Sequence, residues 1–156
     1  MNWYKNKKVS IIFDDIPSVG IRYTIPSLTN EEKKSIEKYP FICRKELEVT
    51  LEDLKKNKIY NFKIPKGYCY DGASIPRFFW RIIGTNTDNR FLIPTLIHDI
   101  LCENHNFINN DKSFSTNVFN ALLESSGITA PKRFFMKNSV ACFQTVFCNW
   151  KEVNNN

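Results

Sequence analysis

The 156-residue sequence has no long hydrophobic run, no C-x-x-C pair and no block of like charge. No apolar stretch approaches the roughly 18 residues that a transmembrane helix needs, which excludes a membrane span. Residues 1–8 are polar, and the next apolar stretch, residues 11–13, is too short for the hydrophobic region of a secretory signal. We therefore expect a soluble, folded domain that is made inside the cell and carries no secretory signal.

The five cysteines are an odd number, and none of them forms a C-x-x-C motif. This pattern argues against a zinc ribbon, a redox motif and a complete disulfide framework. Free and mostly buried thiols in a reducing compartment are therefore the expectation.

Neither sign of charge is concentrated along the chain. Lys and Arg outnumber Asp and Glu by 22 to 16, which gives a net charge of +6, yet no stretch holds five like charges. Such a distribution is typical of a solvated surface, so we do not expect a nucleic-acid partner. Lysine is far commoner than arginine and there are 18 asparagines, a bias that an AT-rich genome produces.

The first half of the chain alternates apolar and polar residues with the period of β-strands. The expected strands cover residues 9–13, 20–25, 41–51 and 59–64. Between the second and third of them, the segment Thr29-Asn30-Glu31-Glu32 has the features of a helix start. We expect a short surface helix or an insertion over residues 29–39.

The second half has the spacing and the end signals of helices. Expected helices run from Pro76 to a stop at Gly84 and over residues 89–102, 111–125 and 131–150. Pro94 lies inside the second of these, which must begin there or be kinked. Strands followed by helices predict an α+β fold, in which N-terminal antiparallel strands pack on a C-terminal group of three to four helices.

The length predicts one domain over residues 1–156. It should be mainly β over residues 1–70 and mainly α over residues 76–150, with a tail at 151–156.

Residues 64–80 form the first unusual segment, Ile-Pro-Lys-Gly-Tyr-Cys-Tyr-Asp-Gly-Ala-Ser-Ile-Pro-Arg-Phe-Phe-Trp. Asp71-Gly72 is a turn signal, and Ser74 precedes a helix led by proline, so one interpretation is a capped strand-to-helix corner. The other is an anion pocket of free backbone N–H groups, with Asp71 as base or metal ligand and Arg77 as charge clamp. Ser74 lacks the G-x-S-x-G context of a nucleophile.

The second unusual segment, Leu-Ile-His-Asp-Ile-Leu-Cys at residues 96–102, places two polar side chains in an otherwise apolar helix. A buried carboxylate is costly unless it is paired. Asp99 is therefore either part of a site or bound at a core junction, with Arg77 or Arg81 as its partner. His98 is either a base or ligand, or a core histidine with its hydrogen bonds satisfied.

A metal site is a further alternative. His98 and Cys102 are four residues apart, a spacing compatible with metal ligation. A set of His98, Asp99 and Asp111 would suit a divalent metal. However, Asp111 begins an expected helix, where a carboxylate is common without any ligand role. The other histidine, His105, lies in a polar stretch and is expected at the surface.

These two segments together resemble the signature of the DUF1353 family, a domain of unknown function. In that family a strand and a glycine turn lead into Thr-Asp-Gly-Ala-Ser-Val/Ile-Pro, followed by a helix with His-Asp-Tyr-Leu-Tyr and by a helix that opens with Asp. Order and spacing agree from about Leu47 to Trp150. The matching positions are Asp71, Gly72, Ala73, Ser74, Pro76, Trp80, His98, Asp99 and Asp111.

The sequence departs from the family pattern at two positions of the signature. Tyr70 stands where the family has threonine, and Cys102 stands where it has tyrosine, so the resemblance does not support a cysteine ligand. The resemblance implies a bacteriophage or prophage source near tail and lysis genes, and it implies no reaction.

Two functions are open at this point. The first is a phage or prophage protein that is associated with the virion or tail, or is an accessory binding protein, with other phage proteins as partners. It would lie in the cytoplasm of the bacterial host or be incorporated into the virion. A buried polar network would then join the sheet to the helices, formed by Asp71, Ser74, His98 and Asp99.

The alternative is a small hydrolase-like enzyme that acts on phosphoester, peptide or cell-wall bonds. Its polar or metal-assisted pocket would be formed by Asp71, His98, Asp99 and Asp111. The candidate catalytic residues are Asp71, Ser74, His98 and Asp99. Arg77 and Trp80 would bind the substrate.

Overall fold

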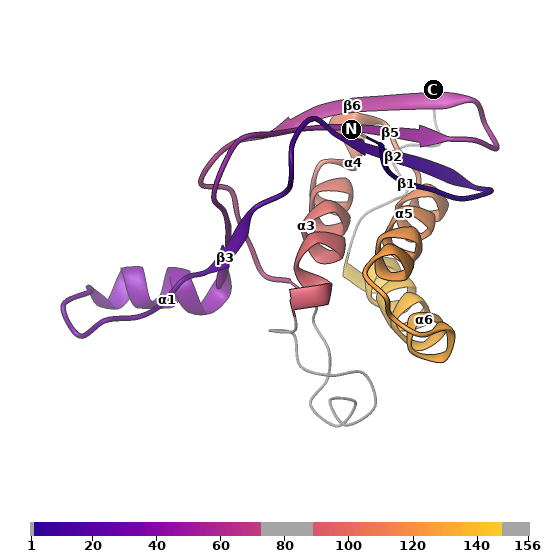
Figure 1. Ribbon diagram of the computed structural model, residues 1–156. Helices are drawn as coiled ribbons and strands as arrows, with labels where there is room; N and C mark the ends of the chain where they lie inside the picture. Colours follow the sequence, from indigo (N-terminus) through magenta and orange to yellow (C-terminus); the bar gives the residue numbers. More distant parts are fainter. Residues whose placement is uncertain (1, 73–88, 148–156) are drawn as a thin grey trace.

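A computed structural model of the chain describes residues 2–72 and 89–147, and the side chains of residues 4–72 and 89–140. The first half contains seven described strands and one helix: β1 (Asn2–Lys5), β2 (Val9–Phe13), β3 (Val19–Ile21), α1 (Asn30–Lys38), β4 (Phe41–Cys43), β5 (Leu47–Asp53), β6 (Lys58–Ile64) and β7 (Cys69–Tyr70). The second half is helical: α3 (Asn89–Glu103), α4 (His105–Ile108), α5 (Lys112–Ser125) and α6 (Ala130–Phe147). The expected α+β fold is confirmed (Figure 1).

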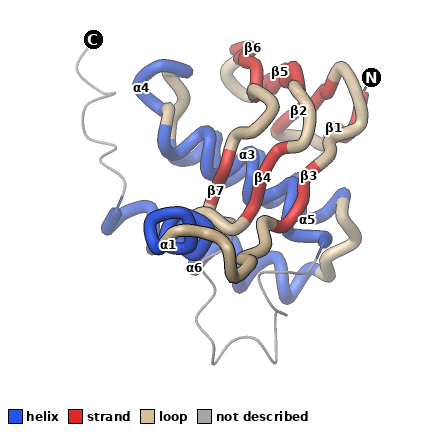
Figure 2. The backbone as a smooth tube through the Cα atoms, turned by 90° about the vertical axis from the view of Figure 1, so that its left-hand side faces the viewer, coloured by secondary structure: helices blue, strands red, loops and turns tan. Residues whose placement is uncertain are grey.

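The strands form two antiparallel sheets. One has the order β1-β2-β5-β6 and the other the order β3-β4-β7 (Figure 2). α3 and α5 lie against the first sheet, and α6 packs on α5 (Figure 1). No described helix is long and apolar enough to cross a membrane.

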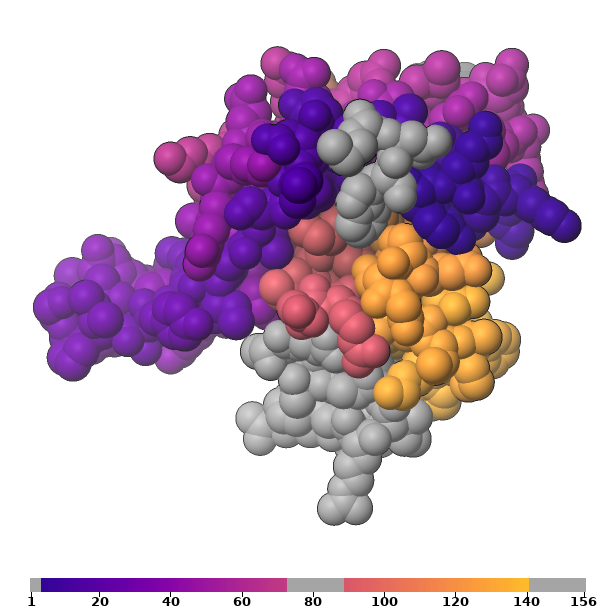
Figure 3. All heavy atoms as spheres, viewed as in Figure 1, coloured from indigo at the N-terminus to yellow at the C-terminus, as the bar shows by residue number. Residues whose placement is uncertain are grey.

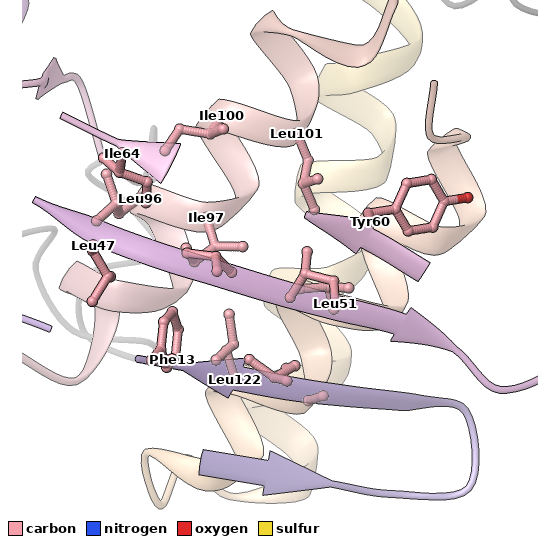
Figure 4. Packing of buried hydrophobic residues seen from close by; sticks show 14 of the residues in the cluster. Phe13, Leu47, Leu51, Tyr60, Ile64, Leu96, Ile97, Ile100, Leu101 and Leu122 are labelled. Carbon is pink, nitrogen blue, oxygen red and sulfur yellow. The ribbon is translucent and has the colours of Figure 1, made fainter. Parts of the chain in front are cut away.

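The main core lies between the four-stranded sheet and helices α3 and α5 (Figure 4). Alternate residues of each central strand point to the helices, as the period-two pattern predicts. In β5, for example, Leu47, Val49 and Leu51 are buried, and the residues between them are more exposed. They face Leu96, Ile97 and Leu101 of α3 within one apolar cluster.

The sequence-based strand over residues 41–51 is wrong as a single element. The structure divides it into β4 and β5, which belong to different sheets. The chain leaves the three-stranded sheet at Arg44, whose N–H donates to the Ser18 carbonyl at 2.8 Å. Both halves bury alternate residues, so the pattern alone does not show the break.

The helices begin close to their expected residues. α3 starts before Pro94 and includes it, and α5 starts directly after Asp111. α4 was not expected, and His105 on it is buried rather than at the surface, with Nδ1 2.8 Å from the Cys102 carbonyl oxygen. The expected helix at residues 76–84 lies outside the described residues.

Helix α1 belongs to a segment that projects from the body of the molecule (Figure 3). Its start is fixed by a capping box, in which the Thr29 side chain accepts from the N–H of Glu32 and the Glu32 carboxylate accepts from the N–H of Thr29. No residue of α1 is buried. This agrees with the expectation of a surface helix.

The cysteines depart in part from the expectation of free thiols. Cys43 and Cys69 are free, and Cys43 is buried. Cys102 is instead disulfide-bonded. The i, i+4 pair of His98 and Cys102 therefore does not offer a free thiolate to a metal ion.

Candidate functional site

The candidate site begins at the end of β7, where the first sequence motif starts. Tyr70 is fully buried, and its ring lies 5.4 Å from the ring of Phe41 on the neighbouring strand. The Tyr70 hydroxyl donates to the Leu92 carbonyl oxygen of α3 at 2.8 Å. The end of β7 is thereby bound to α3.

Gly72 is required at its position by two separate features of the backbone. Its φ of +78° lies in the left-handed region that favours glycine. A Cβ atom would lie only 2.4 Å from a ring carbon of Phe41. The Gly72 N–H donates to Oδ2 of Asp99 at 3.3 Å, which joins two residues 27 positions apart.

Asp71 and Asp99, here called the carboxyl pair, are hydrogen-bonded to each other through their side chains. Asp71 is exposed, whereas the Asp99 side chain is only 13% exposed. Burial, followed by the hydrogen bond with Asp71 and its charge, raises the pKa of Asp99 well above its usual range. The Asp99 carboxyl group therefore releases its proton at a higher pH than a free aspartic acid does.

Two further side chains extend the acidic surroundings of the pair. The Tyr68 hydroxyl donates to Oε2 of Glu103 at 2.7 Å, and burial together with this bond raises the pKa of Tyr68. The charge of Glu103 also contributes to the raised pKa of Asp99. The sequence analysis did not single out Tyr68 or Glu103, although Glu103 follows Asp99 by four residues and thus shares its face of α3.

His98 is next to Asp99 in the sequence but packs in another direction. Its ring lies 5.0 Å from the ring of Phe119 on α5. Burial lowers the pKa of His98 to about 4, so the imidazole is neutral at pH 7. Its Nδ1 is 3.6 Å from Oδ1 of Asp99, which is too long for a hydrogen bond. This packing supports the interpretation of His98 as a core histidine.

Asp111 does not join the other acidic candidates. Its Oδ1 accepts from the N–H of Phe114 at 2.7 Å, which makes it the N-cap of α5. Its other oxygen pairs with the ammonium group of Lys56. Asp111 is therefore a carboxylate at a helix start, which was the alternative to a metal ligand in the sequence analysis.

The metal-ligand set predicted from the sequence is not assembled. Within the side chains that the structure describes, no three His, Cys, Asp or Glu residues are grouped so that they could hold a metal ion. His98, Asp99 and Asp111 are all among these residues. Of the four residues of the predicted pocket, Asp71, His98 and Asp99 lie near one another, whereas Asp111 binds Lys56 and the N–H of Phe114.

Three of the predicted site residues, Ser74, Arg77 and Trp80, lie outside the described residues, as does Arg81. Their roles as nucleophile, charge clamp and substrate contact stay predictions from the sequence. The described part of the candidate site is thus the carboxyl pair, bounded by Gly72, Tyr68 and Glu103.

The fold and the site together define the class of this protein. It is an α+β domain in which a pair of carboxyl groups lies between a short strand and a helix. The family model described as "Protein of unknown function (DUF1353)" matches residues 47–140, which is more than half of the chain. The chain therefore belongs to the DUF1353 family. The match begins at β5 and so leaves β1 to β4 and α1 outside it.

A curated relative is the "Uncharacterized protein y4jT" of Sinorhizobium fredii (strain NBRC 101917 / NGR234), which is 48% identical over 40 residues. The aligned part is 26% of this chain and 12% of that protein. This chain thus matches only a small part of its relative's length. No solved structure matches the chain.

Proposed function

We propose that the domain is an acid–base hydrolase whose described catalytic groups are Asp71 and Asp99. The observation that carries this proposal is the juxtaposition of the exposed Asp71 with the buried Asp99, whose Oδ2 accepts from the N–H of Gly72 at 3.3 Å. Two carboxyl groups that share one proton can supply a base and an acid at the same pH. The exposure of Asp71 supports its role as the group that meets the substrate and the attacking water.

The proposed reaction uses both groups in turn. Asp71 takes a proton from the attacking water while Asp99 gives its proton to the carbonyl oxygen of a peptide bond. On collapse of the tetrahedral intermediate, Asp99 recovers a proton from that oxygen and Asp71 protonates the leaving amine. The pair thereby returns to its starting state, with one proton on Asp99.

The negative charges near the carboxyl pair favour an uncharged substrate among the phosphoester, peptide and cell-wall bonds expected from the sequence. The carboxylate of Glu103, which accepts from the hydroxyl of Tyr68, adds a further negative charge next to the pair. An anionic phosphoester would be repelled by these carboxylates. Peptide or other cell-wall bonds, which are uncharged at the reacting atoms, fit this environment better.

Purified bacterial cell walls offer a direct test, with release of new amino groups and of reducing ends measured separately. Asp71→Asn and Asp99→Asn should each lower the rate at least a hundredfold. Asp111→Asn is the matched control, because Asp111 is a carboxylate of the same chain that lies outside the pair, and it should retain the rate. Full activity of the Asp71→Asn variant, or no cleavage by the native protein, would contradict the proposal.

A second candidate is a virion- or tail-associated or accessory binding protein of a phage or prophage. The observation that favours it is the projecting segment with α1, which buries no residue and lies outside the family match. On this proposal the carboxyl pair only joins β7 to α3. Detection of the protein in purified virions would support this function, and its absence from them would contradict the virion-associated form. The phage source stays a prediction from the resemblance.

A further inference from the structure

The register of the four-stranded sheet brings two lysine-rich turns together. Val9 at the start of β2 pairs with Asp53 at the end of β5, so the β1–β2 turn and the β5–β6 turn lie at the same end of the sheet (Figure 1). The N–H of Leu54 donates to the Lys8 carbonyl oxygen at 2.9 Å and joins the two turns directly. The exposed lysines of this end, here called the lysine end, are Lys5, Lys7, Lys8, Lys55, Lys56 and Lys58.

The backbone under these lysines is held by side-chain bonds within each turn. The Asn6 side chain accepts from the N–H groups of Lys8 and Val9 at 2.8 and 2.9 Å. Asp53 does the same for Lys55 and Lys56 at 3.0 and 3.2 Å. The lysine stems therefore extend from fixed positions.

Two of the lysines bind the neighbouring helices, and the others do not. Lys56 pairs with Asp111, and Lys58 donates to the Asn109 carbonyl oxygen at 3.1 Å. Within the described residues, Lys5, Lys7, Lys8 and Lys55 form no ion pair. Against the six lysines stand three carboxylates, which are Glu52, Asp53 and Asp111. The lysine end thus carries about half of the net charge of +6.

We propose that the lysine end docks the protein onto an anionic phospholipid surface. Clusters of four to eight basic residues bind such surfaces, and each lysine strengthens the binding about fivefold. Two apolar side chains next to the cluster are exposed. Ile59 follows Lys58 on β6 and is 61% exposed, and Phe107 on α4 is 91% exposed.

The chemistry of the lysine end favours a lipid surface over a nucleic acid. All its cations are lysines, which bind phosphate groups as hydrated point charges. Both exposed apolar side chains, Ile59 and Phe107, can enter the interfacial region of a bilayer, whereas the aliphatic Ile59 cannot stack on a base.

Vesicle co-sedimentation tests the proposal. The probes are vesicles of phosphatidylcholine alone and vesicles with one third phosphatidylglycerol, at 50 and 300 mM salt. The native protein should bind the anionic vesicles only, and high salt should lower its partition coefficient at least tenfold. The triple variant Lys7→Glu, Lys8→Glu, Lys55→Glu should bind at least tenfold more weakly.

The chain offers a control with the same change of charge. The triple variant Lys33→Glu, Lys34→Glu, Lys38→Glu alters α1, which carries no lysine of the cluster, and should bind within twofold of the native protein. Equal loss in both variants, binding to neutral vesicles, or no binding to anionic vesicles would overturn the proposal. So would binding of duplex DNA through the same three lysines in the absence of vesicle binding. If the glutamate variant does not fold, the corresponding glutamine variant should still bind at least severalfold more weakly.

Discussion

At the junction of β7 and α3 two acidic side chains touch each other, whereas at the lysine end six basic side chains spread over an exposed surface. The low-dielectric surroundings of Asp99 make a second negative charge costly, which raises the pKa of Asp99. The lysine end avoids that cost because its ammonium groups stay in water and two of them reach helix partners. Burial therefore shifts the pKa of Asp99 in the one cluster, whereas the side chains of the other cluster lie in water.

The strongest way to break the carboxyl pair is through the backbone that holds it. Gly72→Ala places a Cβ against Phe41 at a positive φ and should lower the free energy of unfolding by about 3 kcal/mol. Gly67→Ala is the matched control, because Gly67 has a φ of +89° but nothing within 4 Å of the added Cβ. It should cost about 1 kcal/mol. Equal costs in urea unfolding would show that the Phe41 contact has no effect.

Loss of the hydroxyl group should lower the free energy of unfolding more at the buried Tyr70 than at Tyr68. Tyr70→Phe removes a hydrogen bond from a fully buried ring to the Leu92 carbonyl and should cost about 1.5 kcal/mol. Tyr68→Phe removes a bond to the exposed Glu103 and should cost about 0.5 kcal/mol. Thermal unfolding of both variants measures the order, and a larger cost for Tyr68→Phe would contradict it.

The ion pair between Lys56 of the lysine end and Asp111 of the α5 N-cap should contribute little to the free energy of unfolding. Asp111→Ala removes the N-cap of α5 and should cost about 1 kcal/mol. Lys56→Ala removes only the exposed partner of that carboxylate and should cost less than about 0.5 kcal/mol. If Lys56→Ala proves as costly as Asp111→Ala in denaturant titrations, the ion pair is stronger than its exposure indicates.

His98 should change the pH dependence of stability in the direction opposite to Asp99. The pKa of His98 is lowered to about 4 in the folded protein and is near 6.5 in the unfolded chain. Its contribution to stability is thus present above pH 6.5 and is lost as pH falls towards 4. His98→Gln should remove this loss when unfolding is followed from pH 7 to pH 4. An unchanged slope would show that the imidazole titrates normally.

Much of the fold could be predicted from the sequence. Alternation in β5 and β6, the capping box of α1 and the start of α5 are local signals, and each is found near its expected position. The division between β4 and β5 could not be predicted, since both strands alternate and only the hydrogen bonds assign them to separate sheets. Local patterns specify elements but not their partners.

The candidate site was predicted in part for the same reason. The Asp-Gly turn and the His-Asp pair were singled out, but local spacing grouped His98 and Asp111 with Asp99. The structure instead joins Asp99 to Asp71 and Gly72, far away in sequence. The lysine end was missed because its two turns meet only through the register of β2 and β5.

The most direct test of the account is the pH dependence of stability in the native protein and in Asp99→Asn. A carboxyl group with a raised folded pKa stabilises the protein below its unfolded pKa, near 3.9, and this stabilisation is lost as pH rises through the folded value. The stability difference, native protein minus Asp99→Asn, should therefore fall as pH rises from 4. A difference that rises over this range would mean that Asp99 is ionised and paired with a cation, and it would contradict a proton held between Asp99 and Asp71.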